Sequence, residues 1–314
     1  MSSAPTKNRK TVPPGVFAEI RRLHFRMRRL VNEGVAGGYR SAFRGQGLEF
    51  EEVREYTPGD DIRSIDWKVT ARLRKPYVKS YREERELNVM IALDVSGSTH
   101  TGSRGKLRSE LIAQIGGALT LVAMRNNDRV GLVTFSDQID RYFPPRRNRS
   151  SAWRVLHEVL LAEPTPRGTD FSGLCDFLSG VLHRRSVVFI VSDFNGDGFQ
   201  RALARLGKRH DVTALVVADV SEAELPEVGL VTVVDPETAE TRLIDLSTSA
   251  DRESLLSASQ QRWRALERTF RACDVGAIRL ETDQPFIGSL RRYFESRRAA
   301  PLSSRSVSAS AGRS

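Results

Sequence analysis

The sequence predicts an α/β fold built on an open, mostly parallel sheet with helices on both faces. From residue 87 onward, short apolar runs that are typical of buried strands alternate with stretches of helical periodicity. The runs, such as VVFIVS at 187–192, are apolar at nearly every position, as in strands that are covered on both faces. Sheets of this kind bind ligands at the carboxyl ends of their strands, so a functional site is expected there.

The elements follow in a regular order. We expect strands over 87–94 and in GLVTFSD, VVFIVSD, VTALVVAD and residues 276–280. Helices are predicted near 105–125, 150–161, 170–183, 198–207, 250–273 and 285–297. Two β-like runs flank DPETAE within 225–245 and predict a hairpin that interrupts the alternation.

The rest of the chain divides into three parts. Residues 1–15 are expected to form a flexible leader, and residues 298–314 a disordered tail with too few large apolar residues to pack. Residues 16–86 are expected to combine an amphipathic helix over 16–34 with short strands and loops around TPGDD. The charges near Asp60, Asp61 and Asp66 indicate a salt-bridged structural element or a partner-binding surface. Residues 87–297 then form the α/β domain.

Composition limits the class of protein. With 314 residues, of which 39% are hydrophobic, the chain suits a globular protein with a sizeable core. It contains no apolar run of membrane-spanning length and no apolar middle of a secretory signal, so no membrane span and a cytoplasmic location are expected. Only Cys175 and Cys273 are present, which excludes a disulfide framework, and both are expected to be inert core residues.

The net charge of +10 belongs to the two ends of the chain. Residues 1–46 contain ten Lys or Arg against two Glu, and residues 291–314 contain six Arg against one Glu. The remaining residues therefore carry a net charge of −3. This distribution argues against a dedicated nucleic-acid domain, although a weak contact of the ends with RNA, anionic lipid or an acidic protein surface stays open.

The first strand of the predicted sheet ends in three oxygen-bearing side chains. In IALDVSGST, Asp94 ends the apolar run, and Ser96 and Ser98 follow at alternate positions. Alternate side chains of an extended segment point the same way, so the three groups can converge on one point. A carboxylate and two hydroxyls are hard oxygen ligands of the kind that Mg²⁺, Mn²⁺ or Ca²⁺ prefers. A second acidic ligand is expected from elsewhere in the chain.

Two further loops supply candidates. Asp193 ends the strand VVFIVSDF, and Thr169 lies in PRGTDF just before a helix. The set formed by Asp94, Ser96, Ser98, Thr169 and Asp193 resembles the metal-ion-dependent adhesion site of von Willebrand factor A domains. That resemblance implies a von Willebrand A-like domain in which the hydroxyls ligate the ion, the aspartates act through water, and an acidic residue of a partner fills an open position.

A longer stretch resembles the bacterial domain-of-unknown-function family 58. The segment from GYRSAFRGQGLEF to IALDVSGS is similar to this family, and NNDRVGLVTFSD, PRGTDF, VVFIVSDF and DPETAE extend the similarity over residues 36–290. The resemblance implies an accessory partner of MoxR-type AAA+ ATPases with a chaperone-like role in assembly or maturation. Many members carry N-terminal transmembrane hairpins, which are not expected here.

Two classes of function follow. The first is a metal-dependent adaptor that binds an acidic residue of a protein partner. The alternative is a divalent-metal-dependent hydrolase or phosphotransferase that uses the same ion as a Lewis acid, with Asp170 or His100 as an unplaced candidate base. The pattern G-x-x-x-x-G-K-[S/T] of a phosphate-binding loop and the G-x-S-x-G elbow of a serine hydrolase are both absent from the sequence.

Overall fold

The computed structural model describes residues 39, 42, 43, 49–58, 60–82, 86–102, 107–219, 229–234 and 241–299. The leader, the helix expected over 16–34 and residues 300–314 of the expected tail lie outside these residues, whereas residues 298 and 299 continue a helix that begins at Phe286. The contacts within the chain separate residues 43–87 from the rest, so the molecule consists of two compact units that are described in turn.

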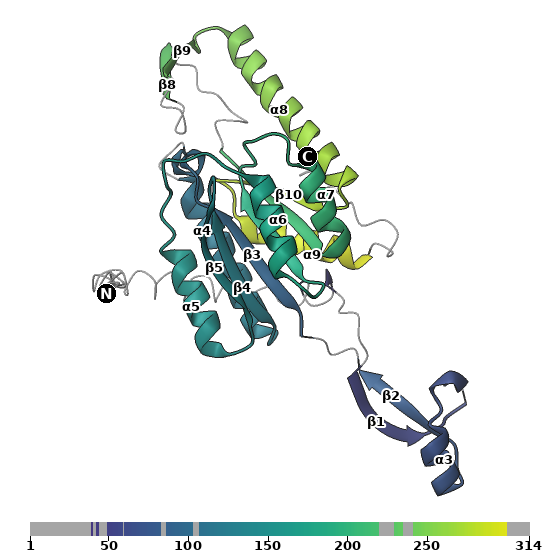
Figure 1. Cartoon of the computed structure of the whole chain (residues 1–314). Helices are drawn as coiled ribbons and strands as arrows, with labels where there is room; N and C mark the ends of the chain where they lie inside the picture. Colours follow the sequence, from purple (N-terminus) through teal and green to yellow (C-terminus); the bar gives the residue numbers. More distant parts are fainter. Residues whose placement is uncertain are drawn as a thin grey trace, which may run out of the picture. The chain divides into compact units, whose positions relative to one another are not determined.

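The larger unit is organised around a six-stranded sheet (Figure 1). Its strand order is β10-β7-β6-β3-β4-β5, and every neighbouring pair is parallel except β4 with β5. The strands are β3 (Asn88–Asp94), β4 (Arg129–Phe135), β5 (Ile139–Arg146), β6 (Val187–Ser192), β7 (Asp211–Ala218) and β10 (Gly276–Glu281). The predicted α/β class with a mostly parallel sheet is confirmed.

Strand β5 is an element that the sequence did not predict. Its segment IDRYFPPR contains Pro144 and Pro145, and proline cannot donate to a strand ladder. The strand lies at the edge of the sheet, where it pairs antiparallel with β4 only, so half of its backbone needs no partner strand. An edge position thus accommodates both prolines.

Helices cover both faces of the sheet (Figure 1). One face packs against α6 (Phe171–Val181), α7 (Gln200–Arg209) and the end of α8 (Ser249–Ala272) in a continuous apolar cluster. The other face packs against α4 (Arg108–Arg125), α5 (Arg149–Leu160) and α9 (Phe286–Ala299). Gly116 allows α4 to approach the sheet closely, because an added Cβ would lie 3.1 Å from Leu93. Cys175 and Cys273 are buried, as predicted.

The sheet has a topological switch point at the end of β3. The chain passes from β3 through α4 to β4 on one side, and it later returns to β6 on the other side. Loops that leave β3 and β6 in opposite directions open a crevice at their carboxyl ends, which is where α/β sheets bind ligands. Asp94 and Asp193 come from these two adjacent strands.

The predicted hairpin is also present. Strands β8 (Leu230–Val234) and β9 (Thr241–Asp245) pair antiparallel from Leu230 opposite Asp245 to Val234 opposite Thr241. None of the helices in the described part of the chain is long and apolar enough to cross a membrane.

The smaller unit contains two antiparallel strands, β1 (Glu49–Glu55) and β2 (Tyr77–Arg82). Between them lie the 3₁₀ turn η1 (Ile62–Ser64) and α3 (Trp67–Leu73), a short helix that the sequence did not predict. Asp66 caps α3, since one of its carboxylate oxygens accepts from the amides of Lys68 and Val69 at 3.0 and 3.2 Å. The Arg54 guanidinium donates to both oxygens of Asp60 at 2.8 and 2.6 Å, so part of the predicted salt-bridged element is present.

Candidate metal site

Asp94 lies at the centre of the polar cluster that follows β3. Its side chain is almost wholly buried, and each carboxylate oxygen accepts one hydrogen bond. The amide of Ser96 donates to Oδ1 at 2.8 Å, and the hydroxyl of Ser192 donates to Oδ2 at 2.5 Å. A carboxylate has about four acceptor positions on its two oxygens, so these bonds leave the group able to accept a further ligand.

Ser96 and Ser98 present their hydroxyls side by side. The 3₁₀ turn η2 (Gly97–His100) follows Ser96, whose side chain makes no capping hydrogen bond to that turn. Instead, the two hydroxyl oxygens lie 3.1 Å apart, and both residues are buried. Adjacent ligands of an octahedral ion with metal–oxygen distances of 2.0–2.1 Å lie about 2.9 Å apart, so this spacing suits two neighbouring ligands of Mg²⁺.

Thr169 comes from the loop between α5 and α6, which is hydrogen bonded to the segment after β3. Thr165 donates to the carbonyl of Val95 through its amide at 2.7 Å, and the amide of Gly97 donates to the carbonyl of Arg167 at 2.8 Å. The Thr169 hydroxyl oxygen is buried and has no hydrogen-bond partner. An unpaired buried hydroxyl is costly, so this oxygen is a candidate ligand for a group that completes the cluster.

Asp193 provides the second buried carboxylate. Its Oδ1 accepts from the amide of Asn195 at 3.1 Å, and its Oδ2 lies 3.6 Å from Nη1 of Arg108. The next residue, Phe194, has a left-handed backbone with φ 53°, a conformation that costs a non-glycine residue free energy. Its ring is stacked on Phe171 at 5.1 Å and packed edge-on against Phe270 at 4.9 Å, so the aromatic core stabilises the turn that positions Asp193.

The electrostatics of the cluster favour a cation. Burial and, after it, the nearby negative charge of Asp193 raise the pKa of Asp94 to about 7, against the hydrogen bonds from Ser192 and Ser96. Two buried carboxylates in one cluster are therefore not fully compensated by the protein itself. Across the described residues, no group of three or more His, Cys, Asp or Glu could hold a metal ion, so a site here depends on hydroxyl ligands.

Two residues of this cluster were missed by sequence reasoning. Ser192 links Asp94 to the next loop, because its hydroxyl also accepts from the amide of Phe194 at 2.8 Å. Arg108 lies in the first turn of α4, where a cation is unfavourable to the helix dipole, and donates to the Ser98 carbonyl and the Thr101 hydroxyl. The sequence offered one signal for each residue. Ser192 stands directly before Asp193 at the end of a strand, and Arg108 places a positive charge at the start of a helix.

Asp170 and His100, the two candidate bases of the enzymatic alternative, are a helix cap and an exposed side chain. The Asp170 carboxylate caps α6 by accepting from the amide of Gly173 at 2.9 Å. His100 is exposed at the end of η2. Neither arrangement favours a general base over a structural or solvated side chain.

The family model described as "Protein of unknown function DUF58" matches residues 52–264. The chain belongs to this family. Relatives of this DUF58 protein include the "Uncharacterized protein Rv1480" of Mycobacterium tuberculosis, 28% identical over 292 residues, with 92% of each chain covered. The "Uncharacterized protein MAV169" of Mycobacterium avium is 31% identical over 165 residues, which cover 52% of this chain and 97% of that protein.

Solved structures resemble the DUF58 chain more remotely. One is the conserved hypothetical protein BatB from Bacteroides thetaiotaomicron, with 16% identity and a TM-score of 0.41 over 68% of this chain and 98% of that one. Another is the SpRpn10 VWA domain, with 12% identity and a TM-score of 0.37 over 65% of this chain and 93% of that domain. Neither likeness bears on what this chain binds.

Proposed function

We propose that the α/β domain is a metal-dependent protein-interaction module. A divalent cation, preferably Mg²⁺, binds among Asp94, Ser96, Ser98, Thr169 and Asp193, and an acidic side chain of a protein partner completes its coordination. The observation that carries the proposal is the buried, unpartnered hydroxyl oxygen of Thr169, in a loop that is hydrogen bonded to the segment between Asp94 and Ser98. A metal ion would give this oxygen the partner that it lacks.

The donor set suits a hard cation that keeps one position for a partner. It offers three hydroxyls and two carboxylates, which are ligands for Mg²⁺, Mn²⁺ or Ca²⁺ rather than for softer metals. With only two acids, the protein would leave the ion short of negative charge once Arg108 is counted. A carboxylate supplied by the partner would improve that balance, so metal and partner should bind cooperatively.

The partner that we propose is a MoxR-type AAA+ ATPase or a protein on which it acts. The support is the resemblance to domain-of-unknown-function family 58 over residues 36–290, whose members resemble accessory proteins of such ATPases. The test is co-purification of the full chain with a MoxR-type ATPase from the same organism. Recovery in Mg²⁺ that disappears in EDTA is expected, whereas equal recovery in both buffers would contradict a metal-dependent contact.

The sharpest test of the metal site is the pair Thr169→Val and Thr120→Val. Both replace a buried hydroxyl by a methyl group, but the Thr120 hydroxyl donates to the carbonyl of Gly116 within α4. Because Thr169→Val removes a proposed ligand, it should weaken Mg²⁺ binding, measured by calorimetry, by about tenfold or more. A factor of ten corresponds to about 1.4 kcal/mol of binding free energy. Thr120→Val should leave Mg²⁺ affinity unchanged.

A second pair of variants tests the role of the Asp94 carboxylate. Asp94→Asn keeps an acceptor for the Ser96 amide but removes a buried charge, so it should abolish the Mg²⁺-induced rise in Tm without lowering Tm in EDTA. Asp176→Asn is the matched control, because Asp176 is exposed and pairs with Arg205 on the surface. If Asp94→Asn keeps a normal Mg²⁺ response, the proposed site is wrong.

A further inference from the structure

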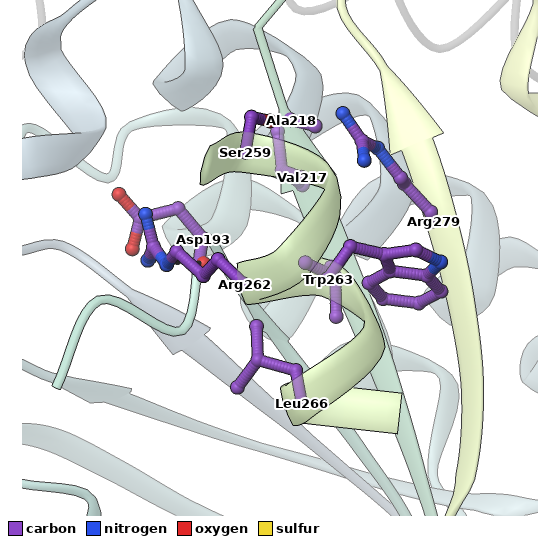
Figure 2. A pocket seen from close by; sticks show the side chains of 9 residues that line it. Asp193, Val217, Ala218, Ser259, Arg262, Trp263, Leu266 and Arg279 are labelled. Atoms are coloured by element: carbon purple, nitrogen blue, oxygen red, sulfur yellow. Dashed lines mark hydrogen bonds between the residues drawn. The ribbon is translucent and has the colours of Figure 1, made fainter. Parts of the chain in front are cut away.

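A pocket beside the candidate metal site has a different chemical character. It lies between α8 and the sheet, and its lining comes from the ends of β6 and β7, from β10 and from one face of α8 (Figure 2). The lining residues are Asp193, Val216, Val217, Ala218, Ser259, Arg262, Trp263, Leu266 and Arg279. Asp193 belongs to both places, so the pocket adjoins the metal site directly.

Two guanidinium groups line this pocket from opposite sides. Arg262 extends from α8 toward Asp193, and its Nη2 donates to the Asp193 carbonyl at 3.4 Å. Arg279 projects from β10 beside Trp263, with its guanidinium carbon 6.0 Å from the centre of the indole ring (Figure 2). The only carboxylate among the lining residues is that of Asp193, which already lies near Arg108. The lining residues therefore include two guanidinium groups against one carboxylate, while Glu281, outside the lining, pairs with Arg279.

Two polar atoms of the pocket are buried without a hydrogen-bond partner. They are the hydroxyl oxygen of Ser259 and Nε of Arg279. Glu281 lies 3.7 Å from that Nε, beyond hydrogen-bond distance, and does not line the pocket. Glu281 thus pairs with Arg279 by charge but leaves its Nε without a hydrogen bond, and because buried polar atoms are normally satisfied, the two atoms leave room for a further acceptor.

We infer that this pocket binds a second acidic side chain of the partner whose first acidic side chain reaches the metal ion. The inference rests on the proposed function, because it assigns the partner of that same site. A carboxylate can accept from the guanidinium groups of Arg262 and Arg279 and from the Ser259 hydroxyl, and charge-assisted bonds of this kind are the strong ones. Trp263 and Leu266 would contact the apolar part of the same side chain.

The metal site and the pocket share Asp193, so the two acidic side chains that reach them must lie close together in the partner. The ligand expected is thus a short segment with two acidic residues at a fixed spacing. Such a segment gains affinity because the second contact forms within an already bound ligand. A segment with a single acid would bind the metal ion only.

The probe is a set of synthetic glycine-rich peptides that carry one aspartate, or one aspartate and one glutamate separated by zero to four glycines. Binding to the full chain is measured in Mg²⁺ by calorimetry, and occupation of the pocket is followed separately by the shift of the Trp263 indole signal in NMR, assigned with Trp263→Phe. One spacing should bind about tenfold more tightly than the single-acid peptide. Equal affinity of all peptides would overturn the inference.

Variants separate the pocket from the metal site. Arg279→Gln and Arg262→Gln should remove the advantage of the second acid while leaving single-acid binding unchanged, and Glu281→Gln should increase that advantage. Arg205→Gln is the matched control, because Arg205 is an exposed arginine of α7 that pairs with Asp176. Arg279 is largely buried, so its substitution could disturb the fold. Arg262 is exposed, so Arg262→Gln keeps the test valid if the Arg279 variant misfolds.

The remaining outcomes distinguish failure of the two proposals. If single-acid binding requires Mg²⁺ but neither arginine variant changes the two-acid peptide, the metal site stands and the pocket inference is wrong. If the two-acid peptide shifts the Trp263 signal in EDTA and Arg279→Gln abolishes that shift, the pocket stands and the metal proposal fails. A larger shift from inorganic phosphate than from any peptide would overturn the carboxylate assignment in favour of a phosphate ligand.

Discussion

The two units of the chain are stabilised in different ways. In the α/β domain, the central strands β3, β4, β6 and β7 are buried almost throughout and pack against helices on both faces. In the smaller unit, by contrast, Phe43 and Val78 are the buried hydrophobic residues among the described side chains, and α3 buries none. Polar contacts such as the Arg54–Asp60 pair and the Asp66 cap hold that unit.

This difference separates a rigid scaffold from an element of low local stability. A two-stranded hairpin is marginal in water by itself, whereas a sheet covered on both faces gains most of its stability from apolar burial. The buried polar cluster around Asp94 can keep its geometry only because the scaffold beneath it is rigid. The following predictions test the comparison, from the largest expected effect to the smallest.

Amide hydrogen exchange should give the largest contrast. Amides of β3 and β6 should exchange only through global unfolding, and amides of β1 and β2 through local opening. Protection factors should therefore differ by at least about a thousandfold, which corresponds to about 4 kcal/mol. The measurement is exchange followed by mass spectrometry of the full chain. Equal protection of the two sheets would show that the smaller unit shares the stability of the domain.

Two arginine–aspartate ion pairs should differ strongly in their contribution to stability. Arg297 donates to both oxygens of Asp211 at 2.6 and 2.8 Å, as Arg54 does to Asp60, but the exposed fractions of the arginine side chains are 6% and 42%. Arg297→Met should cost about 3 kcal/mol in denaturant unfolding, because it removes the cation beside a largely buried carboxylate. Arg54→Met should cost less than about 1 kcal/mol.

The same substitution at two isoleucines measures the value of burial. Ile91 in β3 is 0% exposed, and Ile62 in η1 is 66% exposed. Ile91→Ala should lower the free energy of unfolding by about 2–5 kcal/mol through lost burial and a cavity. Ile62→Ala should change it by less than about 0.5 kcal/mol. A large loss from Ile62→Ala would mean that this side chain is covered in solution.

Acid should destabilise the α/β domain before it breaks the polar contacts of the smaller unit. Burial lowers the pKa of His210 to about 4, while its Nδ1 accepts from the amide of Ser186 at 3.3 Å. The unfolded chain then binds more protons between pH 6.5 and 4, so stability falls as pH falls through that window, by up to about 3 kcal/mol.

His210→Asn is the control for this effect, because its side-chain oxygen can replace Nδ1 as an acceptor without titrating. It should flatten the dependence of the unfolding free energy on pH between 6.5 and 4. In the smaller unit, the hydrogen bonds from Arg54 and Thr57 hold the pKa of Asp60 well below its usual value. That contribution is present above pH 4 and is lost only as the pH falls below that range.

Most of the α/β fold could be predicted from the sequence because its strands carry a strong local signal. Runs such as VVFIVS are apolar on both faces, and the helices between them have regular apolar periodicity. β5 was missed because its prolines are tolerated only at a sheet edge, and a local pattern does not show where the edge lies. α3 was missed because it buries nothing and so has no apolar periodicity to detect.

The candidate site could be predicted in part for a similar reason. Asp94, Ser96 and Ser98 follow a strand in sequence, and Asp193 follows another, so their positions at one sheet edge depend on the strand pattern alone. Ser192 and Arg108 could not be assigned, since their roles depend on hydrogen bonds and charges across loops. The pocket beneath α8 was likewise invisible, because its residues are spread from 193 to 279.

The sequence by itself determined the fold class, the order of the strands and helices of the α/β domain apart from β5, and the oxygen-rich ends of β3 and β6. These features follow from local periodicity, which fixes what each segment can bury. Only the tertiary structure decided that β3 and β6 are neighbours, that the Thr169 hydroxyl lacks a partner, and that Arg262 and Arg279 line one pocket. Such pairings arise from packing between distant segments, where geometry rather than sequence spacing sets which atoms meet.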